Sequence, residues 1–540
     1  MGVLTEPGHR PVPDPAAVAT TEPLDESGTA PGDRRFRPDV EGLRAVAILL
    51  VVLYHAGLSG VNGGYVGVDV FFVISGFVIT GVLLRERTST GRTSLAHFYA
   101  RRARRILPAA TLVIVVTVVA AYFVLGTFAG NQTATDSRWA ELFLANFHFA
   151  AAGTNYLNAH RLPSLLQNFW SLAIEEQFYL VYPTLFLVIC SLRLRMSHRA
   201  RLLIVLTAVV YVSFLWSVFQ TQSSPAAAYF SPFARAWELA LGAIVALATD
   251  RLVRVPRPVA ALMSWVGLAA IVYSAVAYGP NTAYPGAPVA IPVLGAALVI
   301  AGGTAAPAGG AELLLGLAPF GWLGRLSYSL YLWHWPILIL AAESAGKQSL
   351  PFHQNLLPLA LALGASCLTF YLYETPIRHL PLLRRSRNAL GLGAVLVAVA
   401  LLFSTVALEL NLGPSAAYGA PLIAGTPAQV LRAVREAPDI TRLPANLLPP
   451  LGDGETDWGG PKAPCFPVDT ASTIPASCLT GYTTGTRTMV LYGDSHAAMW
   501  GNMYSLLATI NGWRFLDMGK GFCPAADLAF QNPPGIGSPT

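Results

Sequence analysis

The stretch VEGLRAVAILLVVLYHAG, residues 40–57, is apolar enough to lie in lipid, yet it contains an arginine and a histidine. On a helix, the Arg44 and His55 side chains project in directions that differ by only about 20°, so they share one face, and they lie about 16 Å apart along the axis. A charge at the bilayer centre costs about 2.5–3.5 kcal/mol on insertion scales. Either Arg44 snorkels and His55 is a packed imidazole, or His55 is a general base that takes a proton near neutral pH. We favour the second interpretation.

The composition of the whole chain agrees with a membrane protein. Its 540 residues are 54% hydrophobic and 12% charged, against about 25% charged in an ordinary globular chain. This balance excludes a soluble surface and predicts a polytopic membrane protein. The net charge of +6 does not indicate nucleic-acid binding, because the arginines cluster in short loops between apolar runs, where they mark the cytoplasmic side.

Hydropathy predicts a mainly α fold, a bundle of about eleven transmembrane helices, since about 20 apolar residues cross a bilayer. The predicted spans are 43–58, 65–84, 106–125, 170–190, 202–219, 233–249, 259–277, 289–304, 327–344, 355–374 and 389–410. With the N-terminus inside, the loops on that side are basic, as in RLRMSHRAR and RHLPLLRRSR. The predicted outside loops, around 126–165, 220–232, 278–288 and 345–353, carry few basic residues, which satisfies the positive-inside rule. We therefore expect a plasma-membrane protein with a cytoplasmic N-terminus and an outer C-terminal part.

Further polar groups recur within these apolar runs. They are Asp69, Ser75, Arg102, Arg105, Glu175, Glu176, Gln177, Arg235, Glu238, His334 and Glu374. Each polar group in lipid needs a partner, so we expect a polar chamber inside the bundle, although interhelical hydrogen bonds alone would explain some of them. Arg102 and Arg105 share a helix face at i, i+3, whereas we interpret Arg101 and Arg104 as a topology signal only.

Seven of these stretches occur in a characteristic order. They are RPDVEGLRAVAILLVVLYH, GGYVGVDVFFVISGF, FYARRARRILP, WSLAIEEQFYLVYP, FARAWELALG, LGRLSYSLYLWHWP and YETP. Together they resemble, over about residues 36–380, the acyltransferase-three family of integral membrane acyltransferases. The family's arginine, ten residues, histidine pattern falls on Arg44 and His55. Its paired-arginine motif falls on Arg102 and Arg105.

The resemblance implies transfer of an acyl group, often acetyl from coenzyme A, to a surface carbohydrate or glycolipid. His55 would be the base or transient acyl carrier, and Glu175 is a further catalytic candidate. Arg44, Arg102 and Arg105 would hold the phosphates of the acyl-CoA donor, because guanidinium matches phosphate geometry. The implied partners are acyl-CoA, the acceptor and membrane lipids. Neither a metal nor nucleic acid is expected.

The C-terminal part contains a second motif, in TMVLYGDSHAAMWGNMYSLL. A short strand, Met489 to Tyr492, should end in a turn and an amphipathic segment that expose Ser495 at a helix start, where a developing anion is favoured. The stretch resembles the first block of the SGNH hydrolase family, whose nucleophile is this serine. The resemblance implies an outer α/β domain in which Ser495 is a second acyl carrier. The alternative is an ordinary αβ turn.

The later SGNH blocks, including an Asp-x-x-His element, are not found in the 45 residues after Ser495. Either the native chain continues beyond residue 540, which we favour, or the outer module is inactive. Of the three cysteines in this part, Cys465 and Cys478 are expected to form a disulfide, which an oxidising compartment permits. Cys523 is left without a partner in the printed sequence.

These features predict five regions. They are a disordered cytoplasmic tail at 1–36, the acyltransferase domain at 37–380, an additional helix at 381–410, an outer linker at 411–485 and the start of an SGNH-like domain at 486–540. A transporter of an acylated lipid or glycan remains the main alternative function. Inverted repeats would favour it, but the sequence shows no internal repeat. A receptor or scaffold fits poorly with so many ionisable residues inside the spans.

Overall fold

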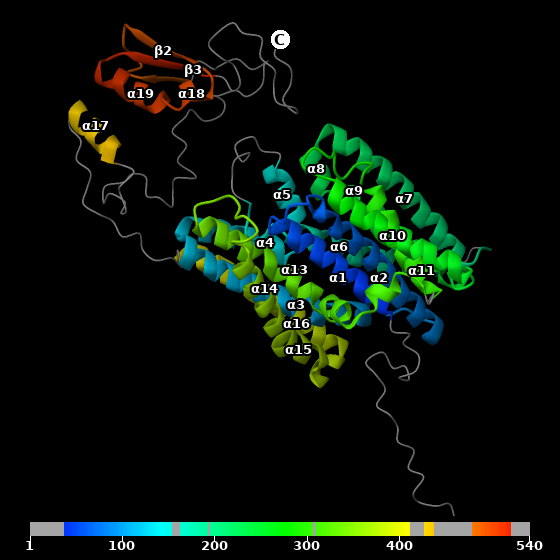
Figure 1. The fold of residues 1–540 in the computed structure, drawn as a ribbon. Coiled ribbons are helices and arrows are strands. Elements are labelled where there is room, and N and C mark those ends of the chain that lie inside the picture. The colour runs from blue at the N-terminus through cyan, green and yellow to red at the C-terminus, as the bar shows by residue number, and fades with distance from the viewer. Residues whose placement is uncertain are drawn as a thin grey trace, which may run out of the picture.

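The structure, a computed structural model, describes residues 37–153, 163–192, 195–305, 309–410, 426–436 and 478–519. Within these ranges, residues 37–410 form a bundle of helices, and residues 478–519 form a small sheet with two short helices (Figure 1). The mainly α class predicted from the sequence is confirmed. The predicted tail at 1–36 and most of the predicted linker lie outside the described residues.

The elements of the bundle follow one another along the chain with short connections. They are α1 (Pro38–His55), η1 (Gly64–Val66), α2 (Gly67–Thr90), α3 (Leu95–Ala120), η2 (Ala121–Leu125), α4 (Thr127–Glu141), α5 (Ala145–Gly153), α6 (Phe169–Ser191), α7 (His198–Ser223), α8 (Pro225–Phe230), α9 (Pro232–Leu252), α10 (Arg257–Ala277), α11 (Ala290–Thr304), α12 (Glu312–Leu315), α13 (Ala318–Ser344), α14 (Leu356–Leu368), η4 (Thr369–Glu374), α15 (Thr375–His379), η5 (Pro381–Arg384) and α16 (Ser386–Leu410).

Every one of the eleven predicted spans coincides with a helix. Among the described residues, eight helices are long and apolar enough to cross a membrane. The other three predicted spans form α1, α11 and α13. The first turn of α1 is acidic, α11 has only 15 residues, and α13 is rich in polar and aromatic side chains. The number of crossings therefore stays a prediction.

Small residues bring the helices of the bundle close together. A Cβ atom added to Gly76 of α2 would collide with the backbone of Leu239 in α9, and one added to Gly242 would collide with Val73. Between membrane helices, close approach of this kind supplies the packing that hydrophobicity cannot. The α2–α9 contact is therefore close, which matters because Asp69 of α2 and Arg235 of α9 pair across it.

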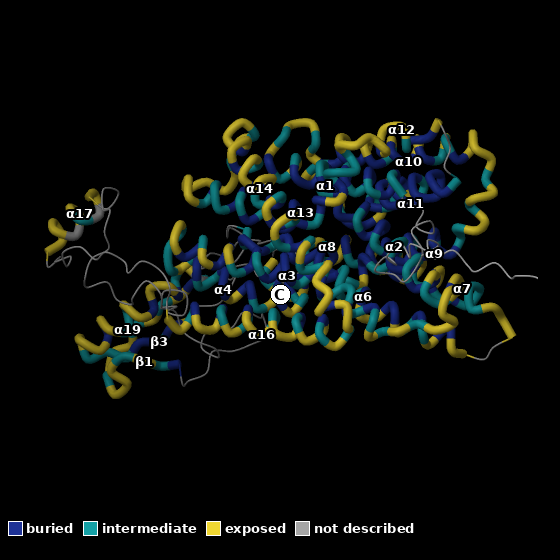
Figure 2. Tube along the Cα trace, turned by 90° about the horizontal axis from the view of Figure 1, so that it is seen from below, coloured by how far each residue is buried: buried dark blue, intermediate teal, exposed yellow. Residues whose placement is uncertain are grey.

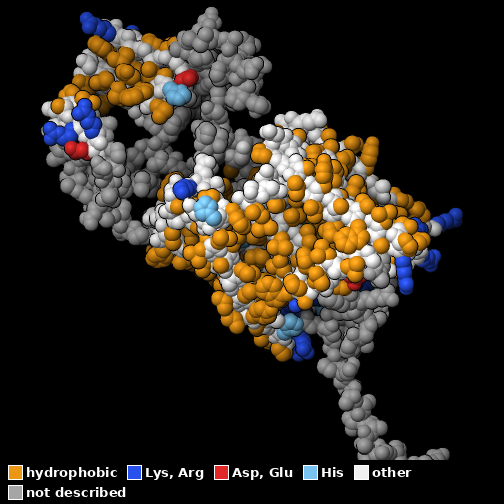
Figure 3. Space-filling model, in the orientation of Figure 1, with side chains coloured by type: hydrophobic (Ala, Val, Ile, Leu, Met, Phe, Trp, Pro, Cys, Tyr) orange, Lys and Arg blue, Asp and Glu red, His pale blue; other side chains and the backbone are white. Residues whose placement is uncertain are grey.

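Burial and side-chain type follow the pattern expected of a bundle in lipid. Buried residues concentrate in the centre, whereas α16 and the rim of the bundle are largely exposed (Figure 2). Hydrophobic side chains cover much of the visible face, and Lys and Arg lie mainly toward its margins (Figure 3). An apolar exterior around buried charged groups is the arrangement that the sequence predicted.

Part of the segment predicted as an outer loop at 126–165 is helical, since it contains α4 and α5. Hydropathy did not indicate these helices because it detects only apolar ones, and α4 is polar on average. The outer location of this segment stays a prediction. The buried face of α4 carries Asp136 and Glu141, and these face other parts of the bundle.

The C-terminal residues form the strand and turn that the sequence predicted. The described elements are α17 (Pro427–Glu436), β1 (Leu479–Gly481), β2 (Thr488–Gly493), α18 (Ser495–Ala498), α19 (Gly501–Ile510) and β3 (Arg514–Gly519). The strand order is β1-β3-β2, with β2 parallel and β1 antiparallel to β3. The segment after the turn differs from the prediction, because it divides into the four-residue α18 and the longer α19.

Candidate functional site

The two histidines singled out in the sequence face each other across the bundle. His55 is the last residue of α1, and His334 lies in α13. The His55 Nδ1 and His334 Nε2 atoms are 3.1 Å apart, and the two rings are stacked with centroids separated by 5.3 Å. Trp335 packs edge-on against the His55 ring at 4.6 Å. His55 is therefore held between helices by a second imidazole and an indole.

Arg44 also turns toward α13. Its guanidinium donates to Ser327 Oγ at 3.0 Å and lies 3.5 Å from Glu41. Arg44 therefore does not snorkel freely to the surface. Ser327 and His334 are seven residues apart, so they lie on one face of α13. The face of α1 defined by Arg44 and His55 thus meets a matching polar face on another helix.

The paired arginines of α3 lie near the same place. Arg102 and Arg105 both interact electrostatically with Glu175 of α6, as does Arg44. Arg102 lies over the Tyr179 ring, 4.3 Å from its centroid. Neither Arg102 nor Arg105 donates a side-chain hydrogen bond to another residue that the structure describes. Their guanidinium donors are thus available to a ligand.

Carboxyl groups from two elements complete this arginine cluster. Glu175 accepts hydrogen bonds from Ser75 and, at 2.6 Å, from Tyr179. Glu374 of η4 accepts from Ser329 at 2.8 Å and interacts electrostatically with Arg105 and Arg44. Glu176 interacts with Arg102 and Arg105, and its Oε1 atom has no partner among the described residues. We use the name arginine–glutamate cluster for Arg44, Arg102, Arg105, Glu175, Glu176 and Glu374.

Tyr331 connects this cluster to the histidine pair. Its ring centroid is 5.5 Å from that of His334, and its hydroxyl is 2.6 Å from Ser171 Oγ. It also interacts electrostatically with Glu175. The sequence analysis missed Tyr331. Its position midway between Ser327 and His334, at i+4 in the same helical face, was the signal that could have identified it.

A second polar cluster is separate from these contacts and fully buried. Arg235 of α9 donates to Asp69 of α2 at 2.5 Å and lies 3.2 Å from Glu238, and all three side chains are at most 1% exposed. The hydroxyl of Tyr284 also donates to Asp69. The rings of Trp170, Tyr229 and Tyr284 surround the Arg235 guanidinium. Tyr229 and Tyr284 were not predicted, because they lie in segments expected to be loops.

Gln177 has a different role from its neighbours on α6. Its amide donates to the Phe143 carbonyl and to Asn146 Oδ1, both at 2.8 Å. Phe143 has a positive φ of 54° at the turn between α4 and α5. Gln177 therefore fixes this turn and does not reach the arginine–glutamate cluster by any contact that the structure records.

A third group of polar residues, also missed from the sequence, belongs to the supposed outer loop. Asp136 of α4 accepts from Ser164 Oγ at 2.5 Å and lies 2.8 Å from His148 Nε2. Trp335 donates from its indole nitrogen to the Ser164 carbonyl at 2.8 Å. The segment around Ser164 is thus tied to the same Trp335 that packs on His55.

The remaining predicted sites concern the C-terminal part. Ser495 is the first residue of α18, directly after β2 and the turn at Asp494. Its neighbour His496 contacts Asp494. Cys478 is disulfide-bonded, but Cys465 lies outside the described residues, so their pairing stays a prediction. Cys190 and Cys367 are free thiols in the bundle.

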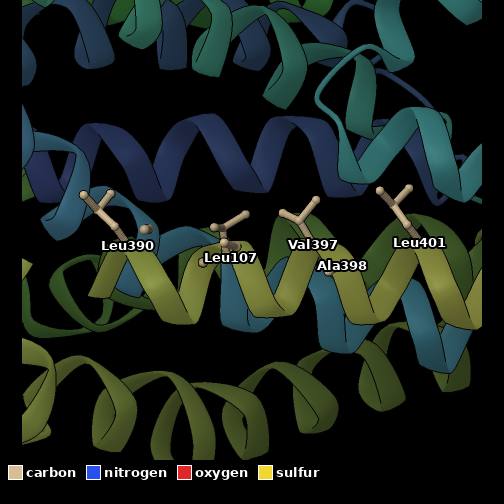
Figure 4. A pocket seen from close by; sticks show the side chains of 8 residues that line it. Leu107, Leu390, Val397, Ala398 and Leu401 are labelled. Carbon is tan, nitrogen blue, oxygen red and sulfur yellow. The ribbon is translucent and has the colours of Figure 1, made fainter. Parts of the chain in front are cut away.

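Two other kinds of site were considered. Within the described ranges, no group of three or more His, Cys, Asp or Glu side chains is arranged to hold a metal ion. A shallow groove between α3 and α16 is lined by apolar side chains, among them Leu107, Leu390, Val397 and Leu401 (Figure 4). Because this groove offers no polar group, the candidate site is the histidine pair with the arginine–glutamate cluster.

Comparison with known proteins identifies the family. Residues 37–410 match a family described as an acyltransferase domain, which is more than half of the chain. The chain belongs to this acyltransferase family. The match confirms the resemblance drawn from the ordered motifs. No solved structure matches this acyltransferase.

This acyltransferase is also similar to several curated relatives. It is 32% identical over 363 residues to "Peptidoglycan O-acetyltransferase OatA" of Listeria monocytogenes, covering 64% of this chain and 56% of the relative. It is 33% identical over 357 residues to "Putative peptidoglycan O-acetyltransferase YrhL" of Bacillus subtilis, an alignment that covers 64% of this chain and 55% of the relative. The alignments thus span only a little more than half the length of these relatives.

Proposed function

We propose that this protein is a membrane O-acyltransferase that moves an acyl group, acetyl in the simplest case, from a cytoplasmic coenzyme A thioester to a glycan on the outer face. The observation that carries the proposal is the convergence of Arg44, Arg102 and Arg105 near one carboxyl group, on the same side of α1 as His55. The names of the relatives, which specify O-acetyl transfer to peptidoglycan, support the reaction class and the glycan acceptor.

The arginine–glutamate cluster is suited to bind the anionic end of the donor. Guanidinium groups bind phosphate oxygens in a bidentate manner, and such charge-assisted bonds are about twice as strong as neutral ones. Arg102 and Arg105 still have their donors available, whereas Arg44 is oriented by Ser327. Glu175 accepts from both Ser75 and Tyr179, and as an ionised carboxylate it has no proton to donate to a phosphate. In this proposal it instead orients Tyr179 beneath Arg102.

His55 then receives the acyl group. The donor's long flexible arm separates its phosphates from its thioester, and His55 lies about 16 Å along α1 from Arg44 by helix geometry. An imidazole nitrogen is a suitable nucleophile for a thioester carbonyl. The acyl group would pass to the outer face on His55, with Ser495 as a second carrier before the glycan hydroxyl.

Donor binding is the first test. We expect Arg102→Ala combined with Arg105→Ala to abolish coenzyme A binding by the detergent-purified chain, and single Lys substitutions to weaken it, because charge is kept while the bidentate geometry is lost. Arg101→Ala is the matched control, since Arg101 lies on the same helix but pairs with Glu86 at 3.3 Å. Unchanged coenzyme A binding by the double variant, measured by calorimetry, would show that these arginines do not bind the donor and only help to set the membrane topology.

Acyl transfer is the second test. The full-length native protein, reconstituted in vesicles and given labelled acetyl-CoA, should transfer the label to an added glycan oligosaccharide, and His55→Ala should abolish transfer with insertion and donor binding intact. Undiminished transfer by a well-inserted His55→Ala variant would remove His55 from the mechanism. Ser495→Ala separates the two stages, since it should block delivery to the glycan while the acyl group still leaves coenzyme A.

A further inference from the structure

The hydrogen bonds of the histidine pair determine where its protons lie. His334 Nδ1 is 3.0 Å from the backbone carbonyl oxygen of Leu330, one helical turn earlier. A carbonyl oxygen only accepts, so His334 Nδ1 must carry a proton and donate it. His334 is fully buried. Within the described ranges no carboxylate pairs with either imidazole. A second proton on His334, which would make its ring cationic, would therefore have no counter-charge in the apolar interior.

Because a neutral imidazole has one donor and one acceptor, the proton on His334 Nδ1 leaves His334 Nε2 unprotonated, with a lone pair that accepts a hydrogen bond. His55 Nδ1, 3.1 Å away, must then be the donor of that contact. By the same rule His55 Nε2 is left with the free lone pair. Trp335, packed edge-on against His55, restricts rotation of the ring that would exchange the two nitrogens.

We infer that His334 is a positioning residue, which fixes His55 as the Nδ1-protonated tautomer and so makes His55 Nε2 the atom that accepts the acyl group. This inference rests on the acyl transfer proposed above. Without His334, solution preference and packing would decide the tautomer, and part of the population would present a protonated, non-nucleophilic Nε2.

The step balances with the groups at hand. The Nε2 lone pair attacks the thioester carbonyl carbon, a C–N bond forms, and the C–S bond breaks with its electron pair going to sulfur. The acylated ring keeps its Nδ1 proton in the hydrogen bond to His334 Nε2, and the thiolate takes a proton from water. When the Ser495 hydroxyl, the next carrier in the proposed relay, attacks the acyl carbon, the C–N bond breaks with its electron pair going to Nε2, and the hydroxyl proton goes to water. That proton replaces the one that the thiolate consumed.

Two substitutions of His334 separate positioning from mere packing. Gln places a side-chain oxygen that can still accept from His55 Nδ1, whereas Phe fills the space and accepts nothing. We expect His334→Phe to lower the rate of acyl transfer by about 10²–10⁴-fold, the range for loss of acid–base assistance, with donor affinity unchanged. His334→Gln should restore part of that loss. His379→Phe is the matched control, because His379 Nδ1 likewise faces the carbonyl of the residue four positions earlier, at 2.7 Å.

A spectroscopic measurement tests the inference without any activity. In the full chain with ¹⁵N-labelled histidine, the His55 signals, assigned by their loss in His55→Ala, should show a protonated Nδ1 and an unprotonated Nε2. In His334→Phe they should shift to the Nε2-protonated form or to a mixture. The same His55 tautomer in wild type and in His334→Phe would overturn the inference, as would full activity of that variant. If the tautomer shifts but wild type transfers no acyl group, the proposed function fails and the positioning stands.

Discussion

The buried Arg235 cluster predicts different consequences for two substitutions that look equivalent. Asp69 accepts from Arg235 and from Tyr284, so it must be ionised to serve both donors. Glu238 contacts the same guanidinium as Asp69, and its Oε2 atom has no hydrogen-bond partner among the described residues. Two buried carboxylates beside one guanidinium would leave an uncompensated charge, so one carries a proton, and the contacts assign that proton to Glu238. The cluster is then neutral: one guanidinium, one carboxylate and one carboxylic acid.

The magnitudes follow from this assignment. Asp69→Asn removes the only ionised partner and leaves a charged guanidinium in a site that is 1% exposed, which costs about 3–5 kcal/mol. Glu238→Gln replaces a neutral acid by a neutral amide of the same shape, so we expect a cost of about 1 kcal/mol or less, the net value of one hydrogen bond. The surface pair Arg199–Asp250 is the matched control, because Asp250 is 63% exposed and such pairs contribute about 0–1 kcal/mol.

Reversible unfolding in mixed detergent micelles, followed by tryptophan fluorescence, measures these differences. Asp69→Asn should lower the free energy of unfolding by several kcal/mol, whereas Glu238→Gln and Asp250→Asn should both lie close to wild type. Equal losses at Asp69 and Glu238 would show that both carboxyls are ionised. A larger loss at Glu238 would reverse the assignment of the proton.

Two further predictions concern residues outside the spanning helices. Burial raises the pKa of Glu141 in α4 to about 7, so the stability that its protonated form contributes is complete below the unfolded value near pH 4.5 and is lost as the pH rises through 7. Unfolding at pH 5 and pH 8 should show this loss in wild type but not in Glu141→Gln, and equal pH dependence in both would exclude Glu141 as the cause. Non-reducing peptide mapping should recover Cys465 linked to Cys478, and a Cys478 peptide joined to Cys523 instead would contradict that pairing.

The sequence predicted the positions of helices and polar residues far better than their partners. Hydropathy depends on the local residue run, and all eleven predicted runs became helices. Helical periodicity likewise put Arg44 and His55 on one face, and the structure packs both against α13. The partners of these residues are 283 and 279 positions away. Periodicity within one helix does not specify which face of a distant helix packs against it.

What the sequence analysis missed has a related cause. Tyr284 lies in a connection between α10 and α11, and Ser164 lies between α5 and α6. In a loop no periodicity distinguishes a residue that folds back onto the bundle from one that faces water. Asp136 escaped notice because α4 is too polar for a hydropathy scan and too short for a span. These residues become visible only through their contacts, which join Tyr284 to Asp69, Ser164 to Trp335 and Asp136 to Ser164.

The contacts between helices also bear on the number of crossings. Arg44 meets Ser327 and His55 meets His334, so α1 and α13 run parallel, and an odd number of crossings must separate them. Six of the long apolar helices lie between them. We therefore predict that α11 is the seventh crossing between them, although it has only 15 residues. Its contacts agree, because Gly295 packs on Gly267 and Gly302 on Ala260, the order of an antiparallel return along α10. A thiol-specific label should then reach a cysteine at Thr282 and one at Gly309 from opposite faces of the membrane; labelling of both from the same face would show that α11 does not cross.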